Sequence, residues 1–309
     1  MAKVEGQASV KWPASNSEPA VRSWLTTRLQ KQFTEDPREG QALLRWMLEA
    51  ATGKPLGVRM MAGPFRFSEH ELNVLAAGSE CVRNGRPIQH IIGQVMFMGL
   101  SLEVGPVALV PRPETEEMTA ATAQWLLDKF KASPSSDLRG VDVGTGSGCI
   151  AVSLKHHLAD WPFEMVAEDV SQEALALALR NAARAGENVI FRHQDALNFM
   201  PGEGEAWDLV ISNPPYIPAS ERELLPEVVR LHDPDLALFV PDEQPLLFYE
   251  ALLRRCMKGG LRPGGACVVE CHELFASAVA KLFSTEFDDV RVENDLQGKP
   301  RFVWAVAPK

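Results

Sequence analysis

Apolar residues in the first third of the chain recur every three or four positions, which is the spacing of one buried helix face. The last of these segments begins with Ser68 and Glu71. This pair is typical of a capping box, in which each side chain accepts a hydrogen bond from the other residue's backbone N–H. The pattern predicts a small helical domain over residues 1–87. Its helices are expected at 20–33, 40–51 and 68–83.

The pattern becomes β-rich after the third predicted helix. Ile88–Phe97 and Leu100–Val110 are runs of apolar and β-branched residues, and Met98-Gly99 between them predicts a hairpin. We expect this hairpin to form a linker over residues 88–112. A helix should follow and end near Lys131, with acidic residues in its first turn that suit the helix dipole.

Strand and helix patterns alternate in the rest of the chain, which predicts a parallel, doubly wound sheet. The strands are expected near 139–143, 164–168, 188–192, 208–212 and 265–270, and the helices near 148–158, 172–185, 245–258 and 274–284. The tail departs from this alternation, since 290–293 and 301–306 look like an antiparallel pair. Residues 113–309 are therefore expected to form an α/β, Rossmann-like domain with seven strands, mostly parallel, and a terminal antiparallel hairpin.

Composition narrows the class of protein. Hydrophobic residues make up 46% of the chain and charged residues 23%, as in a soluble globular protein. No apolar stretch reaches the ~20 residues that span a bilayer, and the N-terminus lacks a signal-peptide layout, so a cytoplasmic location is expected. The five cysteines are scattered and expected to be reduced. Cys267, Cys271 and His272 lack a second ligand pair, so no metal site is expected.

Charge is distributed unevenly along the chain. Residues 1–87 hold 12 Lys and Arg against 9 Asp and Glu, whereas residues 88–309 hold 19 against 32. The second part therefore carries a net charge of −13. Such an acidic surface is a poor match for the phosphates of a nucleic acid, so we expect no direct nucleic-acid binding.

A short motif, Asn213-Pro214-Pro215-Tyr216, directly follows one predicted strand. The Asn213 side-chain carbonyl and the Pro214 main-chain carbonyl are two acceptors that could hold both hydrogens of a planar –NH2 group. Tyr216 adds a flat ring on which such a group could pack. The alternative is a simple turn, because Asn-Pro and Pro-Pro are common turn dipeptides.

A glycine-rich loop follows the first predicted strand of the α/β domain and opens a helix. Glycines allow a tight turn and let a ligand approach the backbone. A dinucleotide fingerprint would need its third glycine one residue later, and a phosphate loop would need Gly-Lys-Ser/Thr at its end. Neither matches here. The candidate ligand-binding residues of this loop are Asp142, Gly144, Thr145, Gly146, Ser147 and Gly148.

The next two predicted strands also end in candidate binding residues. Asp169 follows the second strand, where a carboxylate can accept both hydroxyls of a ribose. It could instead be only a helix-start charge before Ser171, the expected N-cap. Asp195 or the backbone of Ala196 follows the third strand and could meet an exocyclic amine. Four successive strand ends thus carry polar groups suited to one nucleoside-containing ligand and an acceptor.

Taken together, these motifs resemble class I S-adenosylmethionine-dependent methyltransferases, and within them the HemK/PrmC family of release factor glutamine N5-methyltransferases. The stretches that match the family lie at Pro87–Gly93, Phe97–Leu100, Pro111–Glu116, Asn213–Ile217 and Asp233–Phe239. The resemblance implies a class I methyltransferase fold with S-adenosylmethionine as cofactor. It implies that the glycine-loop residues, Asp169, Asp195, Ala196 and Asn213 bind that cofactor. It also implies a catalytic role for Asn213, Pro214 and Tyr216, with Pro215 beside the substrate.

The resemblance implies that the acceptor is the glutamine of the Gly-Gly-Gln loop of class 1 peptide chain release factors. Pro113–Glu116 favours this branch over the sister enzymes that methylate a ribosomal-protein glutamine. Methylation of an exocyclic amine on a nucleic acid stays open, although it needs a basic track. A non-enzymatic binder that kept the fold is a third hypothesis, and the intact Asn213 and Tyr216 argue against it.

Recognition of a whole release factor is expected to need a wider surface than the acceptor slot. The mildly basic helical domain is the expected docking surface, although its arginines could equally form an ordinary solvated face. A monomer is expected, with no membrane partner. The arginines concerned are Arg22, Arg28, Arg38 and Arg45.

Overall fold

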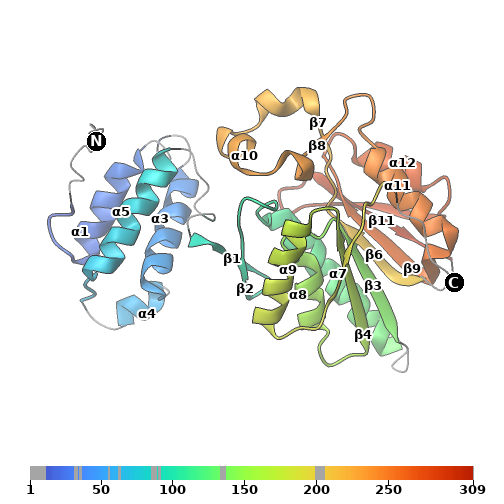
Figure 1. The fold of residues 1–309 in the computed structure, drawn as a ribbon, viewed down its shortest axis with the longest axis horizontal. Helices are drawn as coiled ribbons and strands as arrows, with labels where there is room; N and C mark the ends of the chain where they lie inside the picture. The colour runs from blue at the N-terminus through green and yellow to red at the C-terminus, as the bar shows by residue number, and fades with distance from the viewer. Residues whose placement is uncertain are drawn as a thin grey trace, which may run out of the picture. The chain divides into compact units, whose positions relative to one another are not determined.

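The chain divides into two compact units, Met1–Gly93 and Gln94–Lys309, and each has its own hydrophobic core. Most of the predicted segment Pro87–Gly93 lies outside the described residues. The computed structural model (Figure 1) describes residues 12–30, 34, 37–54, 56–61, 64–84, 89, 92–132, 137–198 and 206–308.

The first unit is helical, as the spacing of its apolar residues predicts. Ser68 and Glu71 form the capping box at the start of the last helix. One short helix was not predicted, since six residues are too few to establish a helical period. The helices are α1 (Glu18–Arg28), α3 (Pro37–Thr52), α4 (Leu56–Met61) and α5 (Glu69–Arg83). The core shared by α1, α3 and α5 includes Val21, Leu25, Leu44, Leu48 and Leu75.

The second unit begins with a hairpin that is shorter than predicted. β1 (Gln94–Phe97) pairs antiparallel with β2 (Leu100–Glu103). The expectation that the second strand continues to Val110 is wrong. The chain leaves the ladder just before Pro106, which has no backbone N–H to donate to a neighbouring strand. The segment between β2 and the next helix is therefore free to contribute to a cavity.

A seven-stranded sheet forms the centre of the second unit, as predicted. Its spatial order is β10-β11-β9-β6-β3-β4-β5, with the five strands from β9 to β5 parallel and β11 antiparallel to both of its neighbours. The α/β fold class and the terminal antiparallel pair are thus confirmed. The strands are β3 (Leu138–Val143), β4 (Phe163–Asp169), β5 (Ile190–His193), β6 (Trp207–Ser212), β9 (Leu261–Glu270), β10 (Asp289–Asn294) and β11 (Pro300–Val306).

Helices cover both faces of this sheet (Figure 1). On one face lie α7 (Pro113–Ala132), α8 (Cys149–His157) and α9 (Gln172–Ala185). The other face is covered by α11 (Leu247–Arg255) and α12 (Ala276–Phe283). The chain passes from α11 into a π-helical turn before β9, and the predicted end of this helix at residue 258 falls inside that turn.

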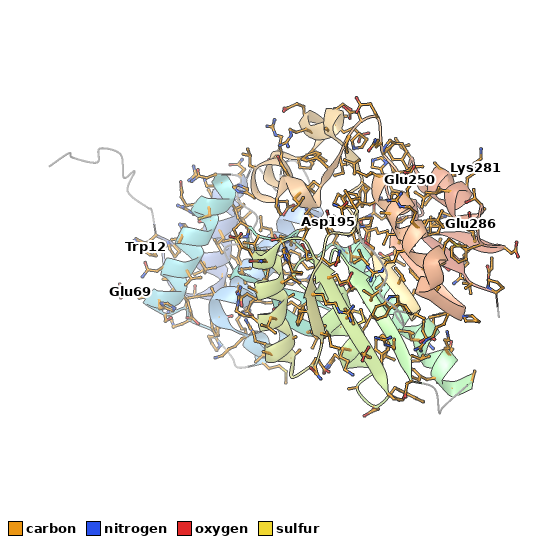
Figure 2. All side chains as sticks on the ribbon, turned by 45° about the vertical axis from the view of Figure 1, so that its right-hand side comes forward. Trp12, Glu69, Asp195, Glu250, Lys281 and Glu286 are labelled. Carbon is orange, nitrogen blue, oxygen red and sulfur yellow. The ribbon has the colours of Figure 1, made fainter. Side chains whose placement is uncertain are left out.

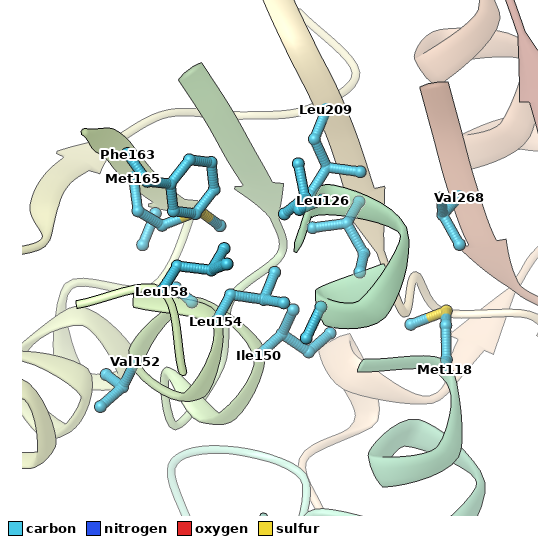
Figure 3. Packing of buried hydrophobic residues seen from close by; sticks show 14 of the residues in the cluster. Met118, Leu126, Ile150, Val152, Leu154, Leu158, Phe163, Met165, Leu209 and Val268 are labelled. Carbon is cyan, nitrogen blue, oxygen red and sulfur yellow. The ribbon is translucent and has the colours of Figure 1, made fainter. Parts of the chain in front are cut away.

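The larger core packs α7 and α8 onto the sheet (Figure 3). Met118 and Leu126 of α7 and Ile150 of α8 meet Leu209 of β6 and Val268 of β9 in one cluster. All five side chains are at most 3% exposed. Burial of each contributes about 1.5–3 kcal/mol relative to exposure, so this layer holds the starts of α7 and α8 rigidly against the strand ends.

The order of the strands creates a crevice at the carboxyl edge of the sheet. Val141 of β3 pairs with Val166 of β4 on one side and with Val210 of β6 on the other. After β3, the chain adds β4 and β5 on one side of it. It then returns and adds β6 and β9 on the other side. Ligands of open α/β sheets bind at such a switch point, beyond the carboxyl ends of the strands.

The connection from β6 to α11 is an irregular excursion with short elements that the sequence did not predict. An ion pair of 2.6 Å between Arg112 and the buried Asp233 ties it to the segment before α7. Its elements are β7 (Ile217–Pro218), η1 (Ala219–Leu224), α10 (Glu227–His232), η2 (Asp235–Ala237) and β8 (Phe239–Val240).

Candidate active site

A cavity of about 440 Å³ lies at the carboxyl edge of the sheet. This is within the usual size of a pocket for a small molecule. Its walls come from the ends of β3, β4, β5 and β6, from the segment before α7 and from η2. Asp195, labelled in Figure 2, is among the lining residues. The predicted site residues that line it are Gly144, Thr145, Gly146, Ser147, Asp169, Asp195, Ala196, Asn213, Pro214 and Pro215.

The glycine loop is held by hydrogen bonds within the protein. The N–H groups of Gly144 and Thr145 both donate to the main-chain oxygen of Glu168, at 2.8 and 2.9 Å. The N–H of Gly146 donates to Asp169, and that of Gly148 donates to the Thr145 carbonyl. A loop whose N–H groups are used in this way is a poor cradle for phosphate, which is bound by free backbone donors.

Two glycines of this loop are required by its shape, for different reasons. Gly146 has φ +55° and lines the cavity, with the position of a Cβ 3.6 Å from the Ala108 Cβ. Gly148 has φ +80°, and a Cβ there would lie 2.9 Å from the Ala178 Cβ of α9. Gly148 does not line the cavity among the described residues; it allows α8 and α9 to pack closely.

Asp142 lies behind the loop rather than at the cavity surface. It is fully buried, and its Oδ2 accepts a hydrogen bond of 2.6 Å from the Thr145 hydroxyl. Burial raises the pKa of Asp142 to about 7, against the opposing effect of the bond from Thr145. The prediction of Asp142 as a direct cofactor contact is untested, and its observed contact is with the loop.

Asp169, at the end of β4, joins two segments around the cavity. Its Oδ2 accepts from the Gly146 N–H and its Oδ1 from the Ser171 N–H, both at 2.8 Å. Ser171 also caps α9, as predicted, by accepting from the Ala174 N–H. A carboxylate has about four acceptor positions, so each oxygen of Asp169 can still accept a hydroxyl. Burial raises the pKa of Asp169, opposed by these backbone bonds.

Asp195 stabilises the turn after β5. Its two oxygens accept from the Leu197 N–H at 2.9 Å and from the Asn198 side-chain amide at 2.6 Å. Ala196 and Leu197 line the same wall of the cavity. The side chain of Asp195 thus shapes the wall that the Ala196 backbone presents.

A buried ion pair stabilises the residue to which the glycine loop is anchored. Arg255 donates to both oxygens of Glu168, at 2.6 and 3.1 Å, and both side chains are at most 3% exposed. The main-chain oxygen of the same Glu168 accepts from Gly144 and Thr145. The pair therefore fixes the residue to which the loop is anchored.

Asn213 is the first member of a hydrogen-bond chain that reaches into the protein. Its Nδ2 donates to the Thr115 hydroxyl at 2.9 Å, and this hydroxyl donates to Glu270 Oε2 at 2.7 Å. The Tyr216 hydroxyl donates to Glu270 Oε1 at 3.1 Å. Asn213 lines the cavity and has its amide nitrogen engaged, so Oδ1 is the side-chain atom left to accept from a ligand.

Tyr216 lies behind the cavity wall. It is not among the described lining residues, its ring packs against the core under α11, and its hydroxyl is bound to Glu270. Burial raises the pKa of Tyr216, as does the nearby Glu270 carboxylate. The predicted stacking of this ring on an acceptor remains a prediction.

The charge of the cavity distinguishes among ligand classes. The lining residues described include three carboxylates, from Asp169, Glu173 and Asp195, and no Lys, Arg or His. Phosphate-bearing cofactors are usually bound by positive charge, which the described lining residues do not provide, or by free backbone donors, and the N–H groups of Gly144, Thr145 and Gly146 are already engaged. The cavity suits a ligand without phosphate, with ribose hydroxyls and with a positive charge.

Comparison with known proteins agrees with this geometry. A family model described as "Methyltransferase small domain" matches residues 116–229. The release factor glutamine methyltransferase of Bacteroides thetaiotaomicron is 38% identical over 228 residues, covering 72% of this chain and 77% of that protein. The enzyme of the same name from Bacillus subtilis is 35% identical over 269 residues, covering 86% and 87%. The chain belongs to the release factor glutamine methyltransferase family.

Members of this family use S-adenosylmethionine as methyl donor, and the protein is accordingly an S-adenosylmethionine-dependent methyltransferase. The cavity fits this cofactor. Asp169 would hold the ribose hydroxyls, the wall at Ala196 and Leu197 would receive the adenine, and Gly146 leaves room for the methionine part. The acidic lining suits the positive sulfonium.

Solved structures show the same fold at low sequence identity. The hMettl16 catalytic domain, crystallised in complex with MAT2A 3'UTR hairpin 1, aligns with a TM-score of 0.53 and 16% identity. The alignment covers 84% of this chain and 90% of that one. It supports the class I methyltransferase fold and carries no information on the acceptor.

Some residues at or next to this cavity are not predicted by the sequence. Glu270 is the last residue of β9. The sequence feature that could have indicated it is an acidic residue at the end of a predicted parallel strand. Thr115 lies inside the segment Pro111–Glu116 that carries the resemblance, but nothing in that segment distinguishes it from its neighbours. The cavity wall over Pro106–Leu109 lies in the run of residues that the sequence predicts to be a strand.

In the described part of the chain, no group of three or more His, Cys, Asp or Glu side chains is arranged to hold a metal ion. None of the described helices is both long enough and apolar enough to cross a membrane.

Proposed function

We propose that this protein transfers the methyl group of S-adenosylmethionine to the side-chain amide nitrogen of the glutamine in the Gly-Gly-Gln loop of class 1 peptide chain release factors. Family membership supports the acceptor class. The observation that carries the proposal is the bond from Asn213 Nδ2 to Thr115, because it leaves Asn213 Oδ1 as an acceptor at the cavity. An acceptor there suits a primary amide, which brings two hydrogens to be held.

The chain's own residues position a weak nucleophile. Asn213 Oδ1 and the Pro214 main-chain oxygen accept the two hydrogens of the glutamine amide, which turns its nitrogen toward the cofactor. S-adenosylmethionine supplies a methyl group on a sulfonium that is already electrophilic. Orientation of this kind can lower a barrier by about 7–11 kcal/mol when the geometry is near attack. The amide nitrogen that receives the methyl group becomes acidic and loses its extra proton after the transfer. No strong base is therefore needed beside Asn213.

We further propose that the helical unit provides a docking surface for the release factor. Arg22 pairs with Glu18 at 3.1 Å, and Arg28 pairs with Glu80 at 3.0 Å, so these two arginines have partners within the unit. Arg45 is exposed. The side chain of Arg38 lies outside the described residues. Among the four predicted arginines, Arg45 is therefore the first to replace in a binding experiment.

The test is a transfer assay with labelled S-adenosylmethionine and three separate acceptor pools, namely class 1 release factors, ribosomal proteins and tRNA. We expect label in the release factors and background levels in the other two pools. Preferential labelling of ribosomal proteins would show instead that the protein methylates a ribosomal-protein glutamine. Efficient labelling of tRNA would contradict the proposed acceptor class.

A further inference from the structure

Glu270 is a buried carboxylate that contacts the reaction site only through other residues. It ends β9, is 1% exposed, and accepts a hydrogen bond from Thr115 with one oxygen and from Tyr216 with the other. Neither Glu270 nor Tyr216 is among the described residues that line the cavity, whereas Thr115 and Asn213 are. Placing a carboxylate in the interior is unfavourable unless its partners compensate, so its position calls for a reason beyond packing.

The chain of bonds has a direction, because each member has a fixed number of hydrogens. An ionised carboxylate can only accept, so above about pH 7, where Glu270 is ionised, the single hydroxyl hydrogen of Thr115 must point to Glu270. Thr115 Oγ1 then presents only lone pairs to Asn213. An Asn side chain facing lone pairs must turn its NH2 group toward them, as observed. The Asn213 carbonyl is thereby turned away from Thr115.

We propose that Glu270 and Thr115 are positioning residues that set the orientation of the Asn213 amide, so that its oxygen rather than its nitrogen faces the acceptor amide. This inference rests on the proposed function for its catalytic consequence. Without the carboxylate, the Thr115 hydrogen can turn to Asn213 and stabilise the flipped amide. The flipped amide presents an NH2 group to the NH2 group of the substrate, and two donors cannot bond one another.

The decisive variant is Thr115→Val, which keeps the shape of the side chain and deletes its hydroxyl. We expect kcat to fall about 100-fold, the size of effect that misorientation in an active site produces, while KM and the affinity for S-adenosylmethionine stay within a few-fold. Thr115→Ser restores the hydroxyl and should recover most of kcat. A merely structural residue would not give this split.

The same helix offers a matched control. Thr122 of α7 is also fully buried, and its hydroxyl donates to the Met118 carbonyl of its own helix rather than to the site. Thr122→Val therefore deletes the same hydroxyl from a similar environment and should leave kcat within a few-fold of wild type. Equal kcat losses in Thr115→Val and Thr122→Val, or an unchanged kcat in Thr115→Val, would overturn the proposal.

A second pair of variants, at Glu270, tests the proposal even if Thr115→Val does not fold. Glu270→Gln, with its NH2 group turned to the Tyr216 oxygen, keeps an acceptor for Thr115 and should retain most of kcat at pH 8, whereas Glu270→Leu removes the acceptor and should lose about as much as Thr115→Val. All kcat values are referred to the number of S-adenosylmethionine sites titrated by calorimetry, so that only folded protein counts. Similar kcat values for the Gln and Leu variants would refute the role of the carboxylate.

One readout separates this proposal from the proposed function. The side-chain amide protons of Asn213, followed by NMR in the full-length protein, should exchange slowly in wild type and fast in Thr115→Val. This needs no acceptor substrate. If wild type fails to methylate release factors but shows the protected amide, only the proposed function fails. If the amide exchanges equally fast in both proteins, the positioning proposal fails whatever the substrate.

Discussion

The Asp169 carboxylate accepts a hydrogen bond from the main-chain N–H of Gly146, 2.8 Å away. The bond joins the carboxyl end of β4 to the loop that follows β3, so a change at either residue affects both walls of the cavity. It also explains why this loop has a fixed shape despite its three glycines, since a carboxylate bond to an N–H is a strong, charge-assisted one.

Asp169→Ala should weaken S-adenosylmethionine binding. In the proposed placement of the cofactor, the variant loses the acceptors for two ribose hydroxyls, and a hydrogen bond to a charged group contributes about 1.5–3 kcal/mol. We expect at least a 100-fold rise in Kd by calorimetry. Glu173→Ala is the control, because Glu173 also lines the cavity but is exposed at the start of α9. A similar small rise in both variants would mean that only the overall charge matters.

Gly146→Val should abolish cofactor binding without unfolding the protein. The side chain would enter the cavity beside Ala108, and the positive φ would add strain of about 1–3 kcal/mol. Gly186→Val is the matched control, since Gly186 ends α9 with φ +75° and has open space around its Cβ position. Both variants should lose similar stability in thermal melts, and only Gly146→Val should lose binding. Wild-type affinity in Gly146→Val would contradict the placement of the cofactor.

Asn213→Ala should separate chemistry from binding. We propose that the lost side chain orients the nucleophile, so turnover should fall by orders of magnitude while the Kd for S-adenosylmethionine changes only a few-fold. Steady-state kinetics with release factor, together with calorimetry, measures both quantities. Near-normal turnover would mean that the Asn-Pro-Pro-Tyr segment is only a turn after β6.

Arg255→Met should destabilise the second unit strongly. It leaves the buried Glu168 carboxylate without the cation that binds both of its oxygens, while Arg192 stays 3.8 Å away. Breaking a buried ion pair costs about 3–5 kcal/mol, and we expect the lower end of this range because Arg192 remains. Adding Glu168→Gln removes the stranded charge and should recover much of the loss. Urea unfolding of the single and double variants tests this. A double variant no more stable than Arg255→Met would show that the loss comes from packing.

Glu270 should make stability depend on pH. Burial raises the pKa of this carboxyl from its ordinary value of 4.5 to about 7, against the opposing effect of the bonds from Thr115 and Tyr216. The folded protein therefore binds the proton more tightly than the unfolded chain does. The stabilisation is fully present below about pH 4.5 and is lost as the pH rises to about 7.

Glu270→Gln removes this titration. Between pH 5 and pH 8, the free energy of unfolding of the variant should rise relative to that of wild type by up to about 3 kcal/mol, the equivalent of the pKa change. Denaturant unfolding of both proteins at several pH values measures the difference. A difference that stays constant with pH would contradict an elevated pKa at Glu270.

The regular elements of the second unit could be predicted because local pattern and burial agree there. β6 is buried along its whole length, and the amphipathic α9 was predicted with its observed bounds. The hairpin was overextended because β-rich composition continues past Glu103, and only tertiary context decides that the next residues line a cavity. The elements between β6 and α11 are too short for any periodic signal.

The site could be predicted only where its residues are contiguous in the sequence. The glycine loop and Asn213–Tyr216 are local motifs, so the sequence indicates them directly. Thr115 and Glu270 are 155 residues apart, and their 2.7 Å contact depends on how α7 packs against β9. No spacing along the chain encodes such a pair. The sequence also could not reveal that Asp142 and Gly148 shape the loop from behind.

The most direct test of the central claim is to locate the transferred methyl group on the product. Purified class 1 release factor is incubated with this protein and S-adenosylmethionine, and its peptides are sequenced by mass spectrometry. We predict a single methyl group on the side-chain nitrogen of the glutamine in the Gly-Gly-Gln loop, absent when Asn213→Ala replaces the wild-type enzyme. A methyl group on any other residue, or an unmodified release factor after incubation with active enzyme, would contradict the account.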